Sequence, residues 1–212
     1  MSRTRIKICG ITREEDLRAA VDCGADALGF VFYQASPRFV SPQRAAELVR
    51  QLPPFVSAVG LFVDAEQAFI ASTLETVQLD LLQFHGDETA AECRRHQRPY
   101  ITAARVRQGL DLVEYAALFP DARGLLLDAY VEGYGGGGKG FDWSLIPPAM
   151  PLPLILAGGL DEHNVGQGIE RVRPWAVDVS SGVEAAKGIK DAARMARFVA
   201  GVRNADNRHP LV

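Results

Sequence analysis

The stretch Arg5-Ile6-Lys7-Ile8-Cys9-Gly10-Ile11-Thr12-Arg13-Glu14-Glu15 sets the pattern for the whole chain. Its first part, Arg5–Cys9, predicts a short apolar strand, and a single glycine separates that strand from a helix. Thr12 and Glu15 have the T-x-x-E spacing of a capping box, which places the start of the helix at Thr12. Cys9 therefore falls where a strand meets a helix. It is either a packed core residue or a thiol beside backbone N–H groups that favour its thiolate.

The same strand-then-helix unit recurs to the end of the chain. Eight apolar runs predict strands, and segments with helical periodicity separate most of them. The predicted strands cover residues 5–9, 27–32, 57–63, 79–84, 100–104, 124–127, 154–157 and 176–179. Alternating units of this kind indicate a parallel sheet, and eight of them indicate an α/β single-domain (β/α)8 TIM barrel. A doubly wound open sheet is the competing fold, but no G-x-G-x-x-G follows the first strand.

Helix ends and domain limits follow from local signals. Ser41-Pro42 predicts an N-cap followed by proline at the first helical position, and Asp64 with Gln67 predicts a second capping box. Gly24 stands where the first helix should stop. The last helix is expected over Ile189–Val202. No linker composition interrupts the chain, so we expect one domain over residues 1–203 and a loose polar tail over residues 204–212.

The composition excludes several classes of protein. The chain has 212 residues and a formal net charge of −3, and no basic patch indicates nucleic-acid binding. No secretory signal opens the sequence, and the apolar run 27–33 is too short to span a bilayer.

Cys9, Cys23 and Cys93 form no C-x-x-C, which argues against a structural zinc site or disulfides and favours the cytoplasm. With few obvious exposed apolar stripes, a monomer is more expected than a dimer.

In a barrel, active sites lie at the carboxyl-terminal ends of the strands. The polar residues predicted at this end are Cys9, Arg38, His85, Asp128 and Asp178. They combine a nucleophile or base, a cation and carboxylates, which is a poor selection for stability alone. We therefore expect them to converge on one site.

Two small loops after the last two strands predict a phosphate site. Gly158 and Gly159 follow the seventh strand, and Ser180, Ser181 and Gly182 follow the eighth. Glycine lets backbone N–H groups approach an anion closely, and phosphate sites in this fold recur after these strands. The alternative is that the glycines only make tight turns.

Six segments together resemble a known family. They are Lys7–Thr12, Ser36–Arg38, Gln83–Gly86, Asp128 with Gly135-Gly136 and Phe141–Trp143, Ala157–Leu160, and Asp178–Glu184. In this order, and over almost the whole chain, they closely resemble the phosphoribosylanthranilate isomerases of tryptophan biosynthesis. Gly137 departs from the family pattern, in which the glycine loop usually has threonine.

The resemblance implies an Amadori rearrangement without a metal or an organic cofactor. The small phosphorylated substrate would be N-(5′-phosphoribosyl)anthranilate, and the product 1-(2-carboxyphenylamino)-1-deoxyribulose 5-phosphate. By motif, Cys9 is the general base and Asp128 the general acid. Arg38 would bind the anthranilate carboxylate, Asp178 the amine, and His85 another part of the substrate.

Both catalytic roles make demands on their surroundings. A free thiol has a pKa of ~8.5, so Cys9 needs neighbours that stabilise its thiolate, and we expect Lys7 and the start of the first helix to supply them. Asp128 must carry a proton to act as an acid, and the apolar residues Leu125–Leu127 are the simplest cause for that.

Each residue also has a plain structural interpretation. Cys9 could be a buried hydrophobe, Asp128 a turn former, and Arg38 the partner of a surface carboxylate. His85 could be a strand-end hydrogen bonder, Asp178 could orient loops, and Lys139 could be a solvated charge or part of a lid.

Other functions stay open at the level of the whole chain. The isomerase of histidine biosynthesis performs the same rearrangement on a similar barrel. Its base and acid positions look like two aspartates, whereas this chain has Cys9 and Asp128 there. Ribulose phosphate epimerases would call for a histidine and aspartate metal set, which we do not find. A non-catalytic sensor of a phosphorylated ligand would need neither Cys9 nor Asp128.

Overall fold

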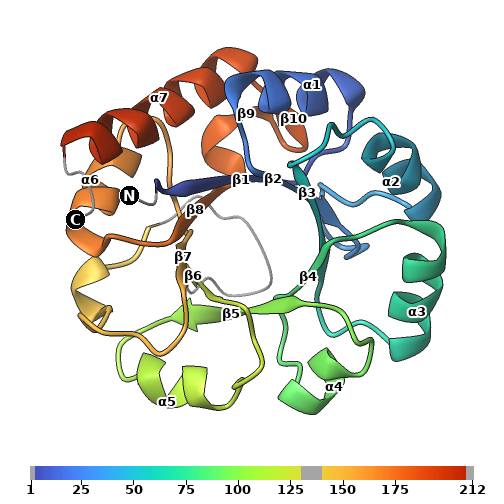
Figure 1. Cartoon of the computed structure of the whole chain (residues 1–212), viewed down its shortest axis with the longest axis horizontal. Helices are drawn as coiled ribbons and strands as arrows, with labels where there is room; N and C mark the ends of the chain where they lie inside the picture. The colour runs from blue at the N-terminus through green and yellow to red at the C-terminus, as the bar shows by residue number, and fades with distance from the viewer. Residues whose placement is uncertain (1–2, 130–139, 209–212) are drawn as a thin grey trace.

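The computed structural model describes residues 3–129 and 140–208, and these form a closed parallel barrel wrapped by helices (Figure 1). Neighbouring strands pair in chain order from β1 to β8, and β8 pairs with β1 to close the ring. The barrel strands are β1 (Arg5–Cys9), β2 (Ala27–Val31), β3 (Ser57–Phe62), β4 (Leu81–Phe84), β5 (Tyr100–Val106), β6 (Leu125–Ala129), β7 (Leu154–Leu156) and β8 (Ala176–Val179). The predicted TIM barrel is confirmed.

The helices cover the outside of the barrel. They are α1 (Glu14–Cys23), α2 (Pro42–Val49), α3 (Gln67–Thr76), α4 (Ala90–Arg94), α5 (Leu112–Ala117), α6 (Val165–Val172) and α7 (Ala192–Arg208). Between β6 and β7, the described residues contain only the short 3-10 helix η1 (Trp143–Leu145). After β8 come the 3-10 helix η2 (Ser181–Val183) and the hairpin of β9 (Glu184–Ala186) and β10 (Ile189–Lys190).

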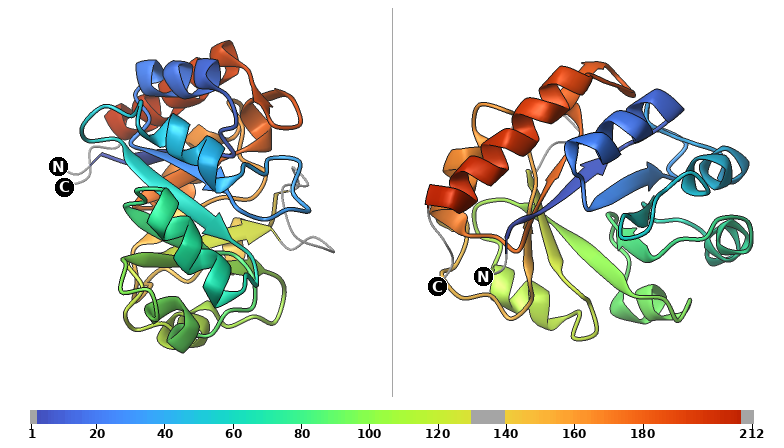
Figure 2. Two further views of the ribbon diagram at one scale, coloured as in Figure 1. Left: turned by 90° about the vertical axis from the view of Figure 1, so that its right-hand side faces the viewer. Right: turned by 45° about the horizontal axis from the view of Figure 1, so that its top comes forward.

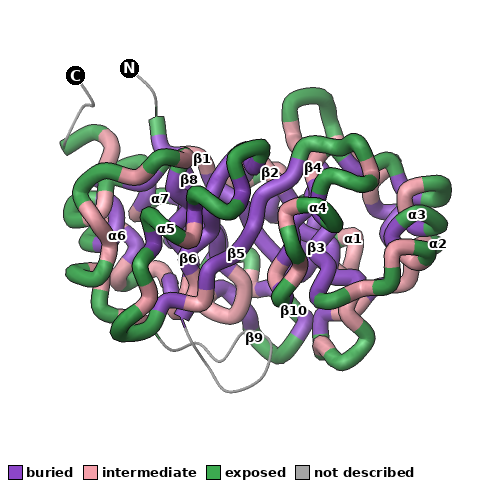
Figure 3. Tube along the Cα trace, turned by 90° about the horizontal axis from the view of Figure 1, so that it is seen from below, coloured by how far each residue is buried: buried purple, intermediate pink, exposed green. Residues whose placement is uncertain are grey.

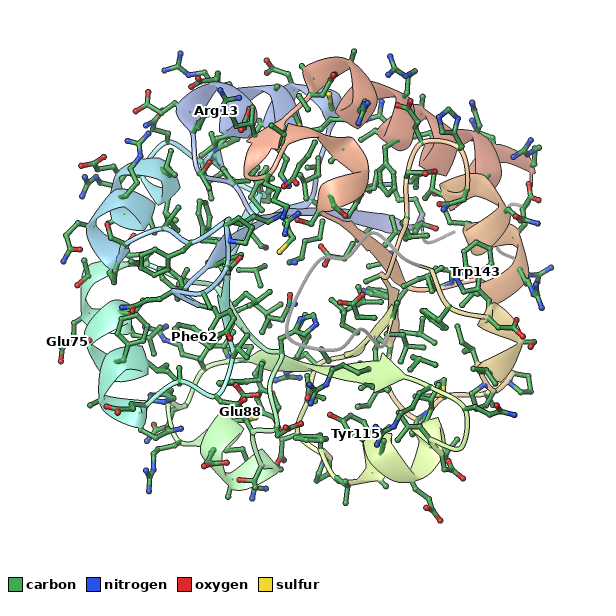
Figure 4. All side chains as sticks on the ribbon, turned by 180° about the vertical axis from the view of Figure 1, so that it is seen from behind. Arg13, Phe62, Glu75, Glu88, Tyr115 and Trp143 are labelled. Atoms are coloured by element: carbon green, nitrogen blue, oxygen red, sulfur yellow. The ribbon has the colours of Figure 1, made fainter. Side chains whose placement is uncertain are left out.

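Apolar burial separates the inside of the helix ring from its outside. The strands are buried along almost their whole length, whereas the outer faces of the helices are exposed (Figure 3). Phe62, for example, lies in the layer between the barrel and α3 and packs against Phe69, while Glu75 on α3 points into solvent (Figure 4). Strands covered on both faces explain the near-continuous apolar runs in the sequence.

Strand alternation divides the side chains between the helix layer and the barrel interior. Ile101, Leu126, Ile155 and Ala176 form one buried cluster, and Cys9, Val31, Leu61 and Val63 form another. Both clusters are separate from the large core between strands and helices.

Two predicted capping boxes are wrong, and long-range contacts explain why. The Thr12 hydroxyl donates to the carbonyl oxygen of Gly188, and the N-cap of α1 is Arg13. Asp64 has a φ of 46°, its carboxylate accepts from the N–H of Asp87, and the N-cap of α3 is Glu66. The Ser41-Pro42 cap and the stop at Gly24 are confirmed.

The predicted C-terminal boundary is also wrong. The last helix begins at Ala192 instead of Ile189, and it continues to Arg208 instead of ending at Val202. Ala205 is buried, and the Asp206 carboxylate accepts hydrogen bonds from the N–H and the hydroxyl of Thr4. Residues 204–208 are thus part of the barrel and not a loose tail. Both ends of the described chain lie at the same end of the molecule (Figure 2).

Candidate active site

The carboxyl-terminal ends of the strands form one end of the barrel, which we call the barrel mouth. Figure 3 places the β9–β10 hairpin at this end and the two termini at the other. The residues predicted for the site form two groups there. One group surrounds Cys9 at the end of β1, and the other surrounds Asp128 near the end of β6, with β7 and β8 between them.

Asp128 is held by a backbone group and by a histidine. Its Oδ1 accepts from the N–H of Ala129 at 2.8 Å, and its Oδ2 lies 3.1 Å from Nε2 of His85. The side chain is 23% exposed, although Leu125, Leu126 and Leu127 are completely buried. The strand is thus as apolar as predicted, but the carboxyl group itself reaches the barrel mouth. Its main side-chain neighbour is His85.

His85 links Asp128 to a residue that the sequence analysis did not select. Nδ1 of His85 lies 3.0 Å from Nε2 of Gln83, which is completely buried. Within the described part of the chain, Oε1 of Gln83 is a buried polar atom without a hydrogen-bond partner. The alternation of β4 could have identified Gln83, since residues two apart on a strand share a face. His85 contacts Asp128 and Gln83, and its predicted role in binding the substrate stays a prediction.

Gly158 packs directly against the acid group. Its φ is 73°, and a Cβ at this position would collide with the N–H of Ala129 and approach Oδ1 of Asp128 to 3.1 Å. Only glycine satisfies both requirements. The loop after β7 is therefore fitted to Asp128.

Cys9 is only 5% exposed, and glycine makes room for it. A Cβ at Gly29 on β2 would lie 2.8 Å from the Cys9 sulfur. The backbone N–H groups next to Cys9 are already used, because those of Gly10 and Ile11 both donate to the carbonyl oxygen of Gly29. These two N–H groups are therefore not free to stabilise a thiolate at Cys9, and the contribution of the helix start, at Glu14, stays a prediction.

Burial and charge act in opposite directions on the thiol. Burial is the largest effect and raises the pKa of Cys9 above its ordinary value. The Lys7 ammonium opposes this shift, as predicted, and so does the Lys190 ammonium, whereas Asp178 reinforces it. The net direction is upward, so in this structure Cys9 favours the neutral thiol more than a free cysteine does.

A buried ion pair joins the first and last barrel strands. Nζ of Lys7 donates to Oδ1 of Asp178 at 2.8 Å, and the two residues are register partners on β1 and β8. Burial lowers the pKa of Lys7, but Asp178 and Cys9 together outweigh it, and the net shift is upward. Asp178, predicted to bind the substrate amine, is the counterion of Lys7 in this structure.

Arg38 is paired as well, with a residue that the sequence analysis quoted but did not assign. Its Nε and Nη2 donate to the two carboxylate oxygens of Glu184 at 2.7 and 2.8 Å, and both residues are buried. Nη1 of Arg38 makes no hydrogen bond within the described residues. Arg38 thus lies at the barrel mouth, where predicted, but two of its five N–H donors are committed to Glu184.

The two glycine-rich loops meet each other. Gly158 and Gly159 both have positive φ, and a Cβ at Gly182 would overlap the carbonyl oxygen of Leu160. The Ser180 hydroxyl donates to the carbonyl oxygen of Cys9 at 3.0 Å. Tight contact explains the small residues, and it brings the predicted phosphate loops to one place beside Cys9.

Some predictions lie elsewhere. Gly137 and Lys139 lie outside the described residues. Cys93 is buried in the core, as expected for a packing cysteine. Within residues 3–129 and 140–208, no group of three His, Cys, Asp or Glu side chains is arranged to hold a metal ion. In the same ranges, none of the helices has the length and apolar character needed to cross a membrane.

Comparison with known proteins identifies the family. Residues 6–201 match the family model of N-(5′-phosphoribosyl)anthranilate isomerase. The N-(5′-phosphoribosyl)anthranilate isomerase of Dechloromonas aromatica is 65% identical over 204 residues, which are 96% of this chain and 98% of the relative.

Solved structures agree with this match. One is a phosphoribosyl anthranilate isomerase in complex with reduced 1-(o-carboxyphenylamino)-1-deoxyribulose 5-phosphate, with 41% identity, a TM-score of 0.84, and coverage of 95% of this chain and 99% of the other. Another shows monomers of the dimeric enzyme of Thermotoga maritima, with 40% identity, a TM-score of 0.84 and the same coverage. The chain belongs to the N-(5′-phosphoribosyl)anthranilate isomerase family.

Proposed function

We propose that Cys9 is the general base and Asp128 the general acid of the isomerase reaction of this family, which the chain carries out in tryptophan biosynthesis. The substrate is N-(5′-phosphoribosyl)anthranilate, a small phosphorylated molecule. The observation that carries the assignment is the placement of the two groups across one barrel mouth, on β1 and β6. A sugar held between them would present its two faces to different groups.

The acid step opens the sugar ring. Asp128 gives its proton to the ring oxygen, the bond from that oxygen to C1 breaks, and the amine nitrogen supplies the electron pair of the new C=N bond. This step requires a protonated Asp128. Nδ1 of His85 faces the amide nitrogen of Gln83, which can only donate, so Nδ1 accepts and the His85 proton lies on Nε2, which donates to Oδ2 of Asp128 over 3.1 Å.

The base step moves the double bond. The Cys9 thiolate removes the proton from C2, and the electron pair shifts through C1 to neutralise the iminium nitrogen, giving an enolamine. The enolamine then loses the proton of its 2-hydroxyl group and gains one at C1, which gives the ketone. Because only the thiolate can act as the base, the charges around Cys9 decide how much of the enzyme is active at a given pH.

We further propose that the loops at Gly158-Gly159 and Ser180–Gly182 bind the 5′-phosphate. The backbone N–H groups of these loops would donate to the phosphate, because the Ser180 hydroxyl already donates to the carbonyl oxygen of Cys9. The N–H groups of Arg38 that do not contact Glu184, on Nη1 and Nη2, are the proposed donors for the anthranilate carboxylate, and the pairing with Glu184 orients them. Asp178 is the candidate partner of the substrate amine, and His85 is a positioning residue for Asp128.

The test is to supply N-(5′-phosphoribosyl)anthranilate and follow its disappearance with the wild type, Cys9→Ala and Asp128→Asn. We expect rapid turnover with the wild type only. Wild-type rates in either variant would refute the assignment of that residue. No turnover by the folded wild type would refute the activity itself.

Three expectations about the chain as a whole remain proposals. The catalytic domain is the barrel together with α7. The protein acts in the cytoplasm, where its three free cysteines stay reduced. It is a monomer, because the large exposed apolar side chains, among them Phe55 and Leu118, do not share one element. Sedimentation equilibrium tests the last point, and a dimer, as in the Thermotoga maritima relative, would overturn it.

A further inference from the structure

Lys190 is a fully buried cation at the barrel mouth, and the proposed chemistry has not used it. Its side chain is 0% exposed and lies on β10, in the hairpin that follows the η2 loop. Nζ donates to Oε1 of Glu184 at 2.9 Å, to the carbonyl oxygen of Ser180 at 3.1 Å and to the Ser180 hydroxyl at 3.3 Å. All three partners are acceptors, as an ammonium group requires.

These contacts connect Lys190 to both functional parts of the mouth. Through Ser180 it holds the first residue of the proposed phosphate loop, and the Ser180 hydroxyl in turn donates to the carbonyl oxygen of Cys9. The backbone N–H of Lys190 donates to Oδ2 of Asp16, which ties the hairpin to α1. The position of Nζ is thus fixed from three sides.

Stability does not explain this arrangement. Taking charges out of water costs several kcal/mol per ion, and buried pairs are often no more stabilising than apolar residues of the same volume. The ion pairs beside Cys9 combine three cations with two carboxylates, which leaves one unbalanced positive charge. The five residues are Lys7, Asp178, Arg38, Glu184 and Lys190. A thiolate at Cys9 would make the group neutral.

We propose that Lys190 is a positioning residue for the isomerase reaction, which holds the Ser180–Gly182 loop in place and whose buried charge stabilises the thiolate of Cys9. The inference rests on the proposed role of Cys9 as the base. Glu184 weakens the effect of the Lys190 charge on the thiolate, because its carboxylate is the counterion of both Lys190 and Arg38. The hairpin thereby links binding of the phosphate end of the substrate to the state of the base.

The other groups around Cys9 are accounted for. Lys7 and Lys190 lower the pKa of its thiol, Asp178 raises it, and Arg38 is close enough for Cys9 to raise the arginine pKa. Tyr33 packs against the apolar cluster that contains Cys9. Among these groups, Lys190 is the cation whose contacts include a proposed substrate loop.

The decisive measurement is the pH dependence of Cys9 alkylation by iodoacetamide, resolved by peptide mass spectrometry in the enzyme without substrate. Lys190→Met should move the midpoint up by about one pH unit, since opposite charges nearby shift a pKa by about 1–3 units. Glu184→Gln should move the midpoint down, because the positive charges of Lys190 and Arg38 then lack their shared counterion. General damage to the site would shift both variants in the same direction.

Two controls and an activity measurement complete the test. Lys187→Met removes an exposed charge from the same hairpin and should leave the midpoint unchanged. Cys93, whose pKa burial raises to about 12, should stay unreactive in folded protein throughout and so reports unfolding. In steady state, Lys190→Met should lower kcat near neutral pH about tenfold, because raising the pKa of Cys9 by one unit removes about nine-tenths of the thiolate. It should also raise KM, because the loop loses its anchor.

The outcomes separate this inference from the assignment of the base. An unchanged midpoint in Lys190→Met, or an equal shift in Lys187→Met, overturns the inference even if Cys9→Ala is inactive. If Lys190→Met does not fold, the test rests on Glu184→Gln. In that case an alkylation midpoint of Glu184→Gln that is unchanged or higher than in the wild type overturns the inference. Full activity of Cys9→Ala would overturn the role of Cys9 as the base, whatever the midpoints are.

Discussion

The two ends of the barrel use their carboxylates in different ways. At the amino-terminal end, Asp26, Asp80 and Asp206 each accept a hydrogen bond from a backbone N–H, those of Ile6, Ala58 and Thr4 respectively, and Asp26 also pairs with Arg3. At the mouth, Asp178 and Glu184 are paired with the side chains of Lys7 and Arg38, and Asp128 contacts the His85 side chain as well as the N–H of Ala129. Backbone partners thus predominate at the amino-terminal end, and side-chain partners at the mouth.

The difference separates structure from chemistry. A backbone N–H that donates to a carboxylate fixes a strand or loop and cannot change its charge when a substrate binds. A carboxylate that is paired with a side chain can share or exchange that partner when a substrate arrives. We therefore expect changes at the mouth to alter turnover, and changes at the amino-terminal end to alter stability.

The largest effect should come from removing the two proposed catalytic groups. Cys9→Ala and Asp128→Asn should each lower kcat by about 10²–10⁴-fold, the usual contribution of a general acid or base. Both side chains are small, so neither change should unfold the barrel, and circular dichroism checks this. If either variant is inactive because it is unfolded, the mouth residue contributes to stability, which contradicts the proposed division between a catalytic mouth and a stabilising amino-terminal end.

The pH dependence should be the next largest effect. Because the reaction needs a thiolate at Cys9 and a protonated general acid at the same time, kcat/KM of the wild type should follow a bell-shaped pH profile, and the burial that raises the pKa of Cys9 extends this profile to higher pH. The sign follows from protonation: at low pH the thiolate is protonated, and at high pH the acid lacks its proton, so activity falls on both sides. A kcat/KM that falls on only one side of its maximum would contradict the pairing of a thiol base with a carboxylic acid.

Crowding the phosphate loop should have a smaller effect, and mainly on binding. Ser181→Leu places a bulky side chain in the loop after β8 and should raise KM about tenfold or more, with a smaller change in kcat. The comparison is with a dephosphorylated substrate analogue, whose KM should not change. If both KM values rise equally, the loop does not bind the phosphate. Gly182 is less suitable, because any Cβ there collides with Leu160.

The smallest effect should come from the amino-terminal end. Asp206→Ala removes two hydrogen bonds to Thr4 and should lower the free energy of unfolding by about 1–3 kcal/mol, while kcat stays unchanged. Urea denaturation and steady-state kinetics on the same preparation measure both quantities. A clear loss of kcat would mean that the two ends are coupled and that the separation drawn above is wrong.

Much of the fold could be predicted from local sequence, since each strand is a short apolar run and β/α alternation leaves few topologies. The errors occurred where a side chain has a distant partner. Thr12 has the right spacing for a cap, yet its hydroxyl bonds Gly188, which is far away in sequence. Asp206 looks like part of a polar tail, but its partner Thr4 is at the other end of the chain. Local patterns contain no information about such contacts.

The same limit applies to the candidate site. Strand ends and motifs led to Cys9, Asp128 and the glycine loops, because barrel geometry brings strand ends together. They did not show that Arg38 is paired with Glu184, or that Lys190 is buried beside them. These are ion pairs across the mouth. Only the closed barrel reveals which charge faces which.

The pairing of β8 with β1 has a consequence for biosynthesis. Cys9 leaves the ribosome well before Asp178 and Lys190, because chains grow at roughly 5–20 residues per second. During this interval the nascent chain has its base but neither the partner strand nor the hairpin beside it. The Cys9 thiol is not yet buried and is open to modification for that time. Because burial, Asp178 and Lys190 reach Cys9 only when the barrel closes, we expect the chemistry of Cys9 to begin with that closure.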